Sequence, residues 1–441
     1  MNTMRWGIVG WVGLVLAGCG GGSSSPVASA PPGPAPIQAV AFTTGQNASV
    51  VIGQSDFTTG TAATTANGIS GSYGDPAYLN GVLYFGDYSN NRVLGFNSLP
   101  TTNGAAANFV LGQTNFTTMT SGTTLSTMSG PLTTATYGGD LFVDEWGGNR
   151  IDVYAPAPTA TTSAPTATTP EAINFTLTAS TEGGLSGADS VALGGGKLIV
   201  TDTNHSRVLI WNTVPTSDTP ANLVLGQTDF TGTAPNQGLA APTAATLYHP
   251  AGVWTDGTRL VVLDFSNNRV LIWNTFPTTD GQPADLVLGQ TGFTTKLSNQ
   301  GASAPTAATL NDPYDGVTSN GLQLFITDSN NNRVLIWNTF PTTNDQAADV
   351  VLGQPNMTTA TNAVTQAGGK LSVWPAAGGH SALGGGSWQQ PLSDLQRPVT
   401  GLLINRLDVL GARSTSHREG PLAGAGVAVA LVNIVSAPGL A

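Results

Sequence analysis

The chain has 441 residues, of which only 9% are charged, and its formal net charge is −11. Lysine occurs only at Lys197, Lys296 and Lys370. An acidic surface with so little lysine repels phosphate backbones, so we expect no nucleic-acid partner. The single cysteine, Cys19, excludes a disulfide within the chain.

The first residues have the pattern of a secretion signal. Arg5 precedes the apolar stretch Trp6–Leu16, which is too short for a good transmembrane helix. The segment Leu16-Ala-Gly-Cys19 then resembles the lipobox of bacterial lipoproteins, in which the signal is removed before the cysteine and a diacylglyceryl group joins its sulfur. We predict a signal peptide over 1–18 and membrane attachment through lipid on Cys19. The alternative is a chance cysteine after an uncleaved anchor.

Residues 19–38 follow as a Gly/Ser-rich and then Pro/Ala-rich run. Such runs cannot bury a core and act as flexible to semi-rigid spacers, so this segment is interpreted as a tether. No aspartate follows Cys19. By resemblance to lipoproteins, this implies the bacterial cell envelope as the location, at the outer membrane.

A repeated motif then dominates the chain: an acidic residue is followed five positions later by arginine and an apolar run. Self-similarity at a fixed period predicts a repeat architecture, and here the arginines are 57–64 residues apart. The five copies are Asp87 with Arg92, Glu145 with Arg150, Asp202 with Arg207, Asp264 with Arg269, and Asp328 with Arg333.

A second marker, VLGQ or VIGQ, recurs in the same units. It occupies 51–54, 110–113, 224–227, 287–290 and 351–354, while the second unit has only Phe175-Thr-Leu-Thr. Short runs of Val, Leu, Ile and Phe between turn residues are typical of strands. Each full unit is therefore expected to form four strands, which in the fifth unit are 315–318, 322–327, 333–337 and 350–353.

The acid, the asparagines and the arginine form the pattern of a tight hairpin. Asn tolerates the left-handed backbone of such a turn, and the acid and arginine can face each other across the two strands, where a pair contributes about 0.2–1 kcal/mol. We therefore interpret them as structural and not catalytic. A large aromatic residue recurs in the third strand, which indicates packing between units, with a ligand platform as the alternative. Its best copies are Trp211, Trp273 and Trp337.

At these residues the chain resembles the NHL-repeat family of β-propellers, over about residues 39 to 357. The resemblance implies four-stranded blades, commonly six, and family functions that include protein binding, RNA binding and lyase chemistry. We expect an all-β, six-bladed propeller over 39–370 with its last blade damaged or incomplete. The strand at Val51–Gln54, preceded by Ala39–Phe42, would complete that last blade.

The tail, residues 371–441, lacks the repeat pattern. No sixth hairpin occurs near residue 386, where the period predicts one. Codons allowed for Gly385–Asp394 can, one nucleotide later, spell Ala-Asp-His-Gly-Asn-Asn-Arg-Tyr-Leu-Ile, so we interpret the tail as a frameshifted sixth blade. A genuine unrelated tail is the alternative, and sequencing the gene across codons 365–395 distinguishes the two. The apolar-leaning run Leu422–Leu440 lies in this tail and does not indicate a membrane span, because Gly, Ala and Pro are frequent in it and Asn433 interrupts it.

Candidate chemistry is sparse. The four histidines do not cluster as zinc ligands do, and turns such as Asp328–Asn332 hold too few carboxylates for calcium. We predict no catalytic residue, metal or cofactor site. The favoured function is a binding or scaffold module for an unknown protein, peptide or glycan. The alternative is a lyase or hydrolase with its site at the centre of the ring.

Overall fold

The computed structural model describes residues 40–124, 126–161, 184–217, 219–314, 316–363 and 365–367, and the backbone of 402–404 and 431–433. The chain divides into the units Met1–Pro36 and Ile37–Ala441, and every described residue belongs to the second. The predicted signal, Cys19, the tether to residue 38 and most of the tail, including the codons of the frameshift hypothesis, lie outside the described residues. No helix within the described ranges is long and apolar enough to cross a membrane.

Five consecutive antiparallel sheets follow the chain, each built from neighbouring strands in sequence order. The first two are β2 (Ala77–Leu79), β3 (Val82–Asp87), β4 (Arg92–Phe96) and β5 (Phe109–Leu111), then β6 (Pro131–Tyr137), β7 (Asp140–Glu145) and β8 (Arg150–Tyr154). The third is β9 (Ala188–Gly194), β10 (Lys197–Asp202), β11 (Arg207–Trp211) and β12 (Leu223–Leu225). The fourth and fifth are β13 (Pro250–Thr255), β14 (Leu260–Asp264), β15 (Arg269–Trp273) and β16 (Leu286–Leu288), then β17 (Val317–Ser319), β18 (Leu324–Asp328), β19 (Arg333–Trp337) and β20 (Val350–Leu352).

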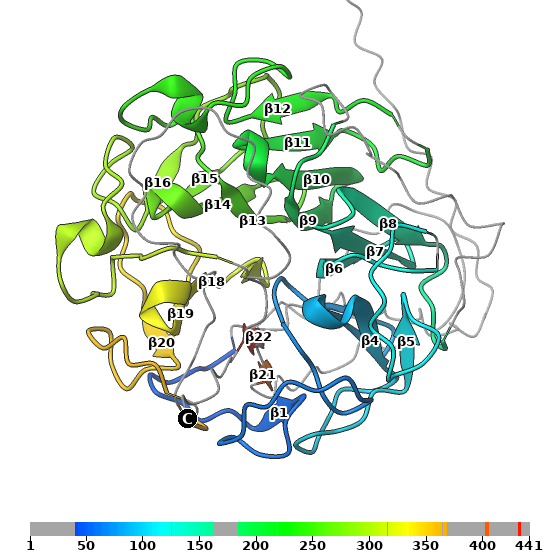
Figure 1. The fold of residues 1–441 in the computed structure, drawn as a ribbon. Helices are drawn as coiled ribbons and strands as arrows, with labels where there is room; N and C mark the ends of the chain where they lie inside the picture. Colours follow the sequence, from blue (N-terminus) through cyan, green and yellow to red (C-terminus); the bar gives the residue numbers. More distant parts are fainter. Residues whose placement is uncertain are drawn as a thin grey trace, which may run out of the picture. The chain divides into compact units, whose positions relative to one another are not determined.

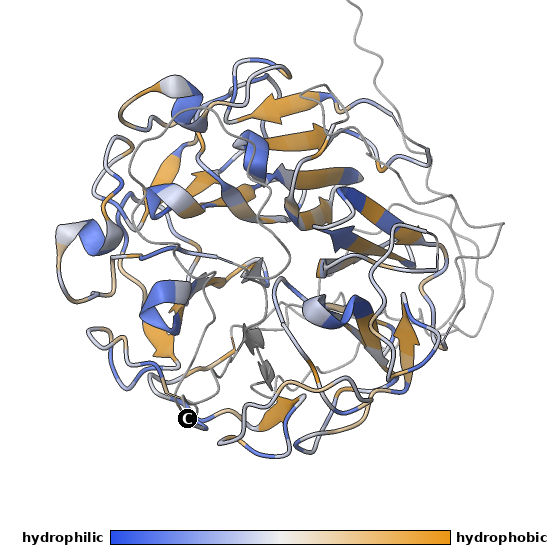
Figure 2. Cartoon of the chain, in the orientation of Figure 1, coloured by the Kyte–Doolittle hydropathy of each residue, from blue (hydrophilic) through white to orange (hydrophobic). Residues whose placement is uncertain are grey.

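The sheets are arranged around a common centre, with the first strand of each sheet innermost (Figure 1). The apolar side chains of neighbouring sheets pack against each other, as where Ile199 and Ile210 of the third sheet meet Val262 and Leu271 of the fourth. Apolar colour follows the strands and polar colour follows the turns (Figure 2). The chain is an all-β propeller, as the repeat predicted.

The prediction of six four-stranded blades, the last damaged or incomplete, was wrong, because the residues that the structure describes form five blades. Four blades have four strands and the second has three. Residues 162–183, which include the drifted Phe175 segment, lie outside the described ranges. A further small sheet joins β1 (Val50–Ile52) to β21 (Leu402–Ile404) and β22 (Leu431–Asn433). The sequence contains five Asp-to-Arg hairpins, and neither β21 nor β22 begins or ends in a sixth.

The segment from Val40 to Ile52 packs between the fifth blade and the first. The Val40 amide donates to Oε1 of Gln323 at 2.7 Å, and Nε2 of Gln323 donates to the Val40 carbonyl at 2.9 Å. Phe42 meets the ring of Phe325 edge-on at 5.8 Å. Ile52 packs with Ile69 and other apolar residues of the first blade. The start of the described chain thus links two blades that lie far apart in sequence.

The two ends of the blades differ. In an up-and-down sheet, the turn between the second and third strands lies at the same end as the loop that enters the first strand. We call this end the hairpin face. Its turns include the short 3-10 segments η1 (Tyr88–Asn90), η2 (Thr203–His205), η4 (Phe265–Asn267) and η6 (Ser329–Asn331), and its entry loops include η3 (Pro235–Gly238) and η5 (Ser298–Gly301).

Candidate functional site

The acid and arginine of each repeat form a buried ion pair at the hairpin face. The Asp carboxylate and the Arg Nε lie 2.6–2.7 Å apart in four blades, and all eight side chains are 0% exposed. The pairs are Asp87 with Arg92, Asp202 with Arg207, Asp264 with Arg269, and Asp328 with Arg333. Removing one partner of a buried pair costs about 3–5 kcal/mol, well above the value expected for an exposed cross-strand pair.

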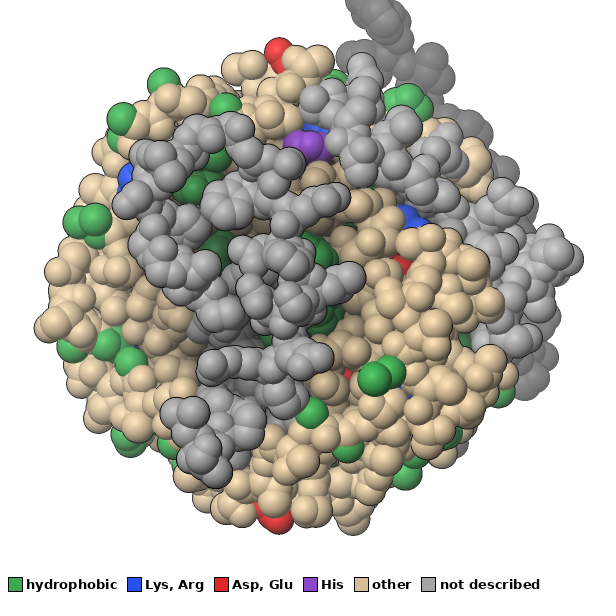
Figure 3. Space-filling view, in the orientation of Figure 1, with side chains coloured by type: hydrophobic (Ala, Val, Ile, Leu, Met, Phe, Trp, Pro, Cys, Tyr) green, Lys and Arg blue, Asp and Glu red, His purple; other side chains and the backbone are tan. Residues whose placement is uncertain are grey.

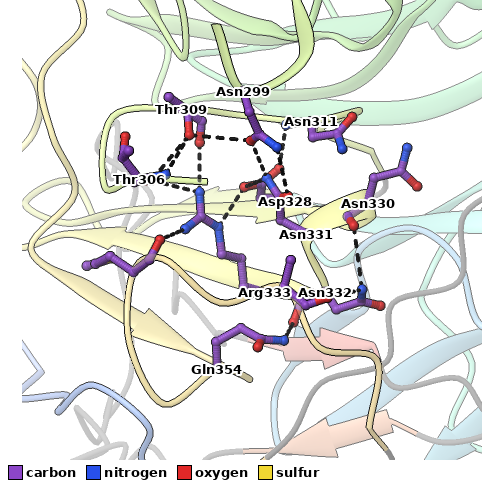
Figure 4. Close-up of polar contacts among 12 residues, drawn as sticks. Asn299, Thr306, Thr309, Asn311, Asp328, Asn330, Asn331, Asn332, Arg333 and Gln354 are labelled. Atoms are coloured by element: carbon purple, nitrogen blue, oxygen red, sulfur yellow. Dashed lines mark hydrogen bonds and ion pairs between the residues drawn. The ribbon is translucent and has the colours of Figure 1, made fainter. Parts of the chain in front are cut away.

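The remaining guanidinium nitrogens hold backbone carbonyls of two loops, as Figure 4 shows for Arg333. Nη2 donates to the carbonyls of Thr306 and Thr309 at 2.8 Å, both in the loop that enters the blade. Nη1 donates at 2.6 Å to the carbonyl of Met357, in the loop that leaves it. Oδ1 of Asp328 accepts from an amide of the entry loop. The pair therefore anchors loops, and its polar atoms are committed to that role.

The asparagines and the glutamine of the repeat complete this network. Asn331 Nδ2 donates to Asp328 Oδ2 at 2.8 Å, and Asn332 adopts the left-handed conformation with φ 52°. Gln354, the last residue of VLGQ, donates from Nε2 to the carbonyls of Asn332 at 2.9 Å and Thr361 at 2.8 Å. Its Oε1 accepts from the Thr361 amide at 3.0 Å. The recurring positions of the motif thus form hydrogen bonds that hold the turn and the loop after the fourth strand in place.

The second blade departs from this pattern because its arginine faces two acids. Arg150 lies 2.6 Å from Glu145 and 3.1 Å from Asp152. Burial raises the pKa of Glu145, Asp152 raises it further, and Arg150 opposes both effects. One cation cannot neutralise two buried carboxylates, so Glu145 binds its proton more tightly than an exposed glutamate does.

The recurrent tryptophans are buried between blades. Trp211, Trp273 and Trp337 are each 1% exposed, and each packs in a cluster with residues of the preceding blade. Their Nε1 atoms donate to backbone carbonyls at 2.8–3.0 Å. Because their rings are covered, they offer no platform on which a ligand could stack.

The two histidines within the described ranges take part in turns. His205 Nδ1 lies 2.9 Å from Asp202 Oδ2, in the place where other blades use an Asn amide. His249 Nδ1 lies 3.1 Å from Ser266 Oγ. Across the described ranges, no three or more His, Cys, Asp or Glu side chains gather as metal ligands would.

The sequence reasoning missed a group of acids and aromatic residues where the innermost strands meet the hairpin face. We call it the inner cluster, and it consists of Asp75, Asp144, Asp189, Tyr73, Tyr88, Trp146 and Tyr314. Tyr73 and Tyr88 meet edge-on at 5.3 Å, and Tyr88 and Trp146 at 6.4 Å. These aromatic side chains are half-buried, so the rim of the cluster remains accessible.

The carboxyls of the inner cluster are strongly perturbed. Burial raises the pKa of Asp189 to about 7, and hydrogen bonds to the hydroxyls of Thr203 and Tyr314 oppose the rise. The Thr203 hydroxyl proton is directed to the Pro250 carbonyl at 2.6 Å, which leaves Tyr314 as the donor to Asp189. Burial also raises the pKa of Asp144 well above its usual range, and the nearby Asp189 adds to this.

Asp75 has a similar environment on the first blade. Burial raises its pKa to about 7, opposed by the Val317 amide, which donates to Oδ2 at 3.4 Å. Neighbouring atoms enclose its carboxyl, yet the residue as a whole keeps intermediate exposure. A signal for this site exists in the sequence, where Asp75, Asp189 and Asp315 each stand two residues before an apolar residue of the innermost strand.

Sequence comparisons identify no relative, since neither a family model nor a curated protein matches the chain. Solved structures match at the level of fold. The nidogen/laminin complex matches with 16% identity over 65% of this chain and 85% of that chain, with a TM-score of 0.38. The WD40 β-propeller domain of Doa1 matches with 10% identity over 73% of this chain and 88% of that chain, with a TM-score of 0.37. Streptogramin B lyase matches with 15% identity over 63% of this chain and 67% of that chain, with a TM-score of 0.33. At these identities and scores, the matches say nothing about ligand or chemistry.

Proposed function

We propose that this protein is an NHL-like, lipid-anchored propeller of the bacterial cell envelope that binds a protein, peptide or glycan on its hairpin face. The repeated charges hold loops together and are buried, so they do not supply the recognition surface. Recognition instead falls to the loops of that face and to the rim of the inner cluster. A propeller is well suited to this role because its blades form a rigid support for many loops.

The distribution of exposed apolar side chains carries this proposal. Within the described ranges, Met119, Leu239 and Leu297 are 59%, 51% and 63% exposed, and all three lie on loops of the hairpin face. Charged side chains are few on the surface that Figure 3 shows. Apolar side chains on a surface with little charge are typical of binding sites for a partner.

A crosslinking experiment tests the face. A photoreactive amino acid placed at Leu239 or Leu297 should capture a partner in intact cells. Matched positions at Tyr137 and Leu322 are similarly exposed, at 39% and 42%, but lie at the opposite end of the blades, where Tyr137 ends β6 and Leu322 precedes β18. Equal capture from both ends, or capture only from the second pair, would refute the assignment.

Membrane attachment is a separate part of the proposal, supported by the Leu16-Ala-Gly-Cys19 motif and the tether. Cells grown with radioactive palmitate should label the wild-type protein and not the Cys19→Ser variant. The wild type should also fractionate with the outer membrane, and the variant should be released from it. Label on the variant would refute lipidation at Cys19.

An enzymatic function has one observation in its favour, the pKa of about 7 at Asp189, which suits a general base. The two functions predict different behaviour of Asp189→Asn. If the protein is an enzyme, the wild type converts its ligand and Asp189→Asn binds the ligand without converting it. If the protein is a binding module, neither the wild type nor the variant converts the ligand.

A further inference from the structure

Two carboxyls of the inner cluster converge on one segment of the fifth blade. Tyr314 donates to Asp189 of the third blade, and the Val317 amide donates to Asp75 of the first. The first, third and fifth blades therefore meet at these two contacts, and Asp144 and Trp146 add the second blade to the same site at the hairpin face.

The acids of this site have no basic partner among the residues that the structure describes. Within the described ranges, no lysine or arginine forms an ion pair with Asp75, Asp144 or Asp189. Asp189 is 4% exposed, and its Oδ1 has no hydrogen-bond partner among the described atoms. Both carboxyl oxygens of Asp144, which is 0% exposed, are also without a partner. Buried polar atoms are almost always satisfied, so a further group is expected to pair with Asp189.

Asp144 and Asp189, the two acids that are buried as whole residues, have different roles. Asp144 lies on β7 and is 0% exposed, and burial together with the nearby Asp189 raises its pKa well above the usual range, so a ligand cannot reach it directly. Asp189 faces Tyr88 of η1, Thr203 of η2 and Tyr314, so it is the acid on the side of the accessible rim. Of Asp75 and Asp189, Asp75 is the residue with the greater overall exposure.

The rim selects an organic cation over a metal ion. Tyr88 interacts with Asp189 and packs against the rings of Tyr73 and Trp146. Phe265 lies 5.1 Å from Tyr314, which donates to Asp189. Aromatic rings attract ammonium groups near carboxylates, whereas they cannot replace the oxygen ligands of a hard metal ion. An ammonium group also has three donors, which suits several separate acceptors.

We propose that the inner cluster binds a primary ammonium group of a peptide partner, a lysine side chain or an amino terminus, between Asp75 and Asp189. This assignment rests on the proposed function and names the chemistry that the hairpin face recognises. Binding displaces a proton from the carboxyls, because an ionised acid is required opposite the cation. Affinity should therefore increase as these acids lose their protons.

Calorimetry with the full chain in detergent tests the proposal. The probe is the peptide acetyl-Gly-Lys-Gly-amide, and the same peptide acetylated on lysine is its neutral control. With pKa values of about 7, the ionised fraction of each acid rises about tenfold between pH 6 and pH 8, so affinity should rise at least about tenfold. The acetylated peptide should not bind.

Two substitutions locate the site. Asp75→Asn and Asp189→Asn should each weaken binding about tenfold or more. Asp229→Asn removes the same charge from an exposed loop of the same face and should change affinity less than about twofold. Equal losses in all three variants, binding of the acetylated peptide, or saturable calcium binding without peptide binding would overturn the proposal. If the peptide fails while crosslinks persist at Leu239 and Leu297, this inference is wrong and the proposed function stands.

Discussion

Arg269→Ala should be among the most destabilising single substitutions in the chain. The change leaves the Asp264 carboxylate 0% exposed and without its cation, at a cost of about 3–5 kcal/mol. The carbonyls of Thr243 and Thr246 also lose bonds of 2.9 Å to Nη2. Water entering the vacated space replaces those bonds in part, so we expect a total of about 5 kcal/mol.

Arg259→Ala is the matched control. Arg259 pairs with Asp256 at 2.6 Å, but the two side chains are 21% and 29% exposed. Its guanidinium also lies 3.9 Å from the ring centre of Phe340. An exposed pair contributes about 0–1 kcal/mol and the ring contact about 0.5–1 kcal/mol, so the loss should stay below about 2 kcal/mol.

Urea unfolding followed by near-ultraviolet circular dichroism measures both variants. The double variant Asp264→Asn with Arg269→Met should lose less stability than the sum of its single variants, because no uncompensated charge remains. If Arg269→Ala costs no more than Arg259→Ala, the ion pair does not hold the loops and the reasoning fails.

Three further variants test other contacts. Gln290→Ala removes bonds of 2.9 Å to the carbonyls of Asn268 and Leu297 and should cost about 2–3 kcal/mol in urea unfolding, against less than about 1 kcal/mol for the more exposed Gln282→Ala. Trp273→Phe should cost about 2 kcal/mol through lost packing and the lost bond to Gln282, and unfolding at the level of wild type would contradict its burial. Asp189→Asn should match the wild type near pH 4 and exceed its stability at pH 8 by up to about 4 kcal/mol, because the raised pKa of Asp189 gives stability that is lost as pH rises from about 4 through 7. If the difference in free energy of unfolding between the variant and the wild type is the same at pH 4 and pH 8, the buried acid is not unpaired.

The strands were predictable because their signals are local. Apolar runs bounded by Asn, Asp and Gly placed the third strand of the fifth unit at 333–337, where β19 forms. The second strand, expected at 322–327, forms as β18 at Leu324–Asp328. The left-handed asparagine was also predictable, because Asn332 occupies the one turn position that needs a positive φ.

The number of blades was not predictable in the same way. Counting VIGQ at 51–54 as part of a further unit led to six, whereas the chain supplies five hairpins and five blades. The strand at this marker, β1, instead pairs with β21 and β22, whose sequences carry no repeat signal. A repeat motif identifies the units that contain it and cannot predict the partners of a strand that stands alone.

The burial of the ion pair and the inner cluster depend on contacts between distant residues. Thr306 and Met357, which Arg333 holds, are 27 and 24 residues away along the chain. The cluster joins Asp75, Asp189 and Tyr314 from three blades, and hairpin patterns contain no information about such meetings. The signal that the sequence offers is an acid that recurs two residues before an apolar residue of the innermost strand.

The segment from Val40 to Ile52 has a consequence for the order of folding. Its contacts with the fifth blade span 283 residues at Gln323 and 307 at Val351, whereas each hairpin closes over five. Loop closure over such distances is slow. During synthesis this segment emerges before the blades but finds its partner last, so the outer edge of β20 stays open until then. Blades should therefore gain protection from hydrogen exchange early, and the contact between the first and fifth blades should form in the final kinetic phase.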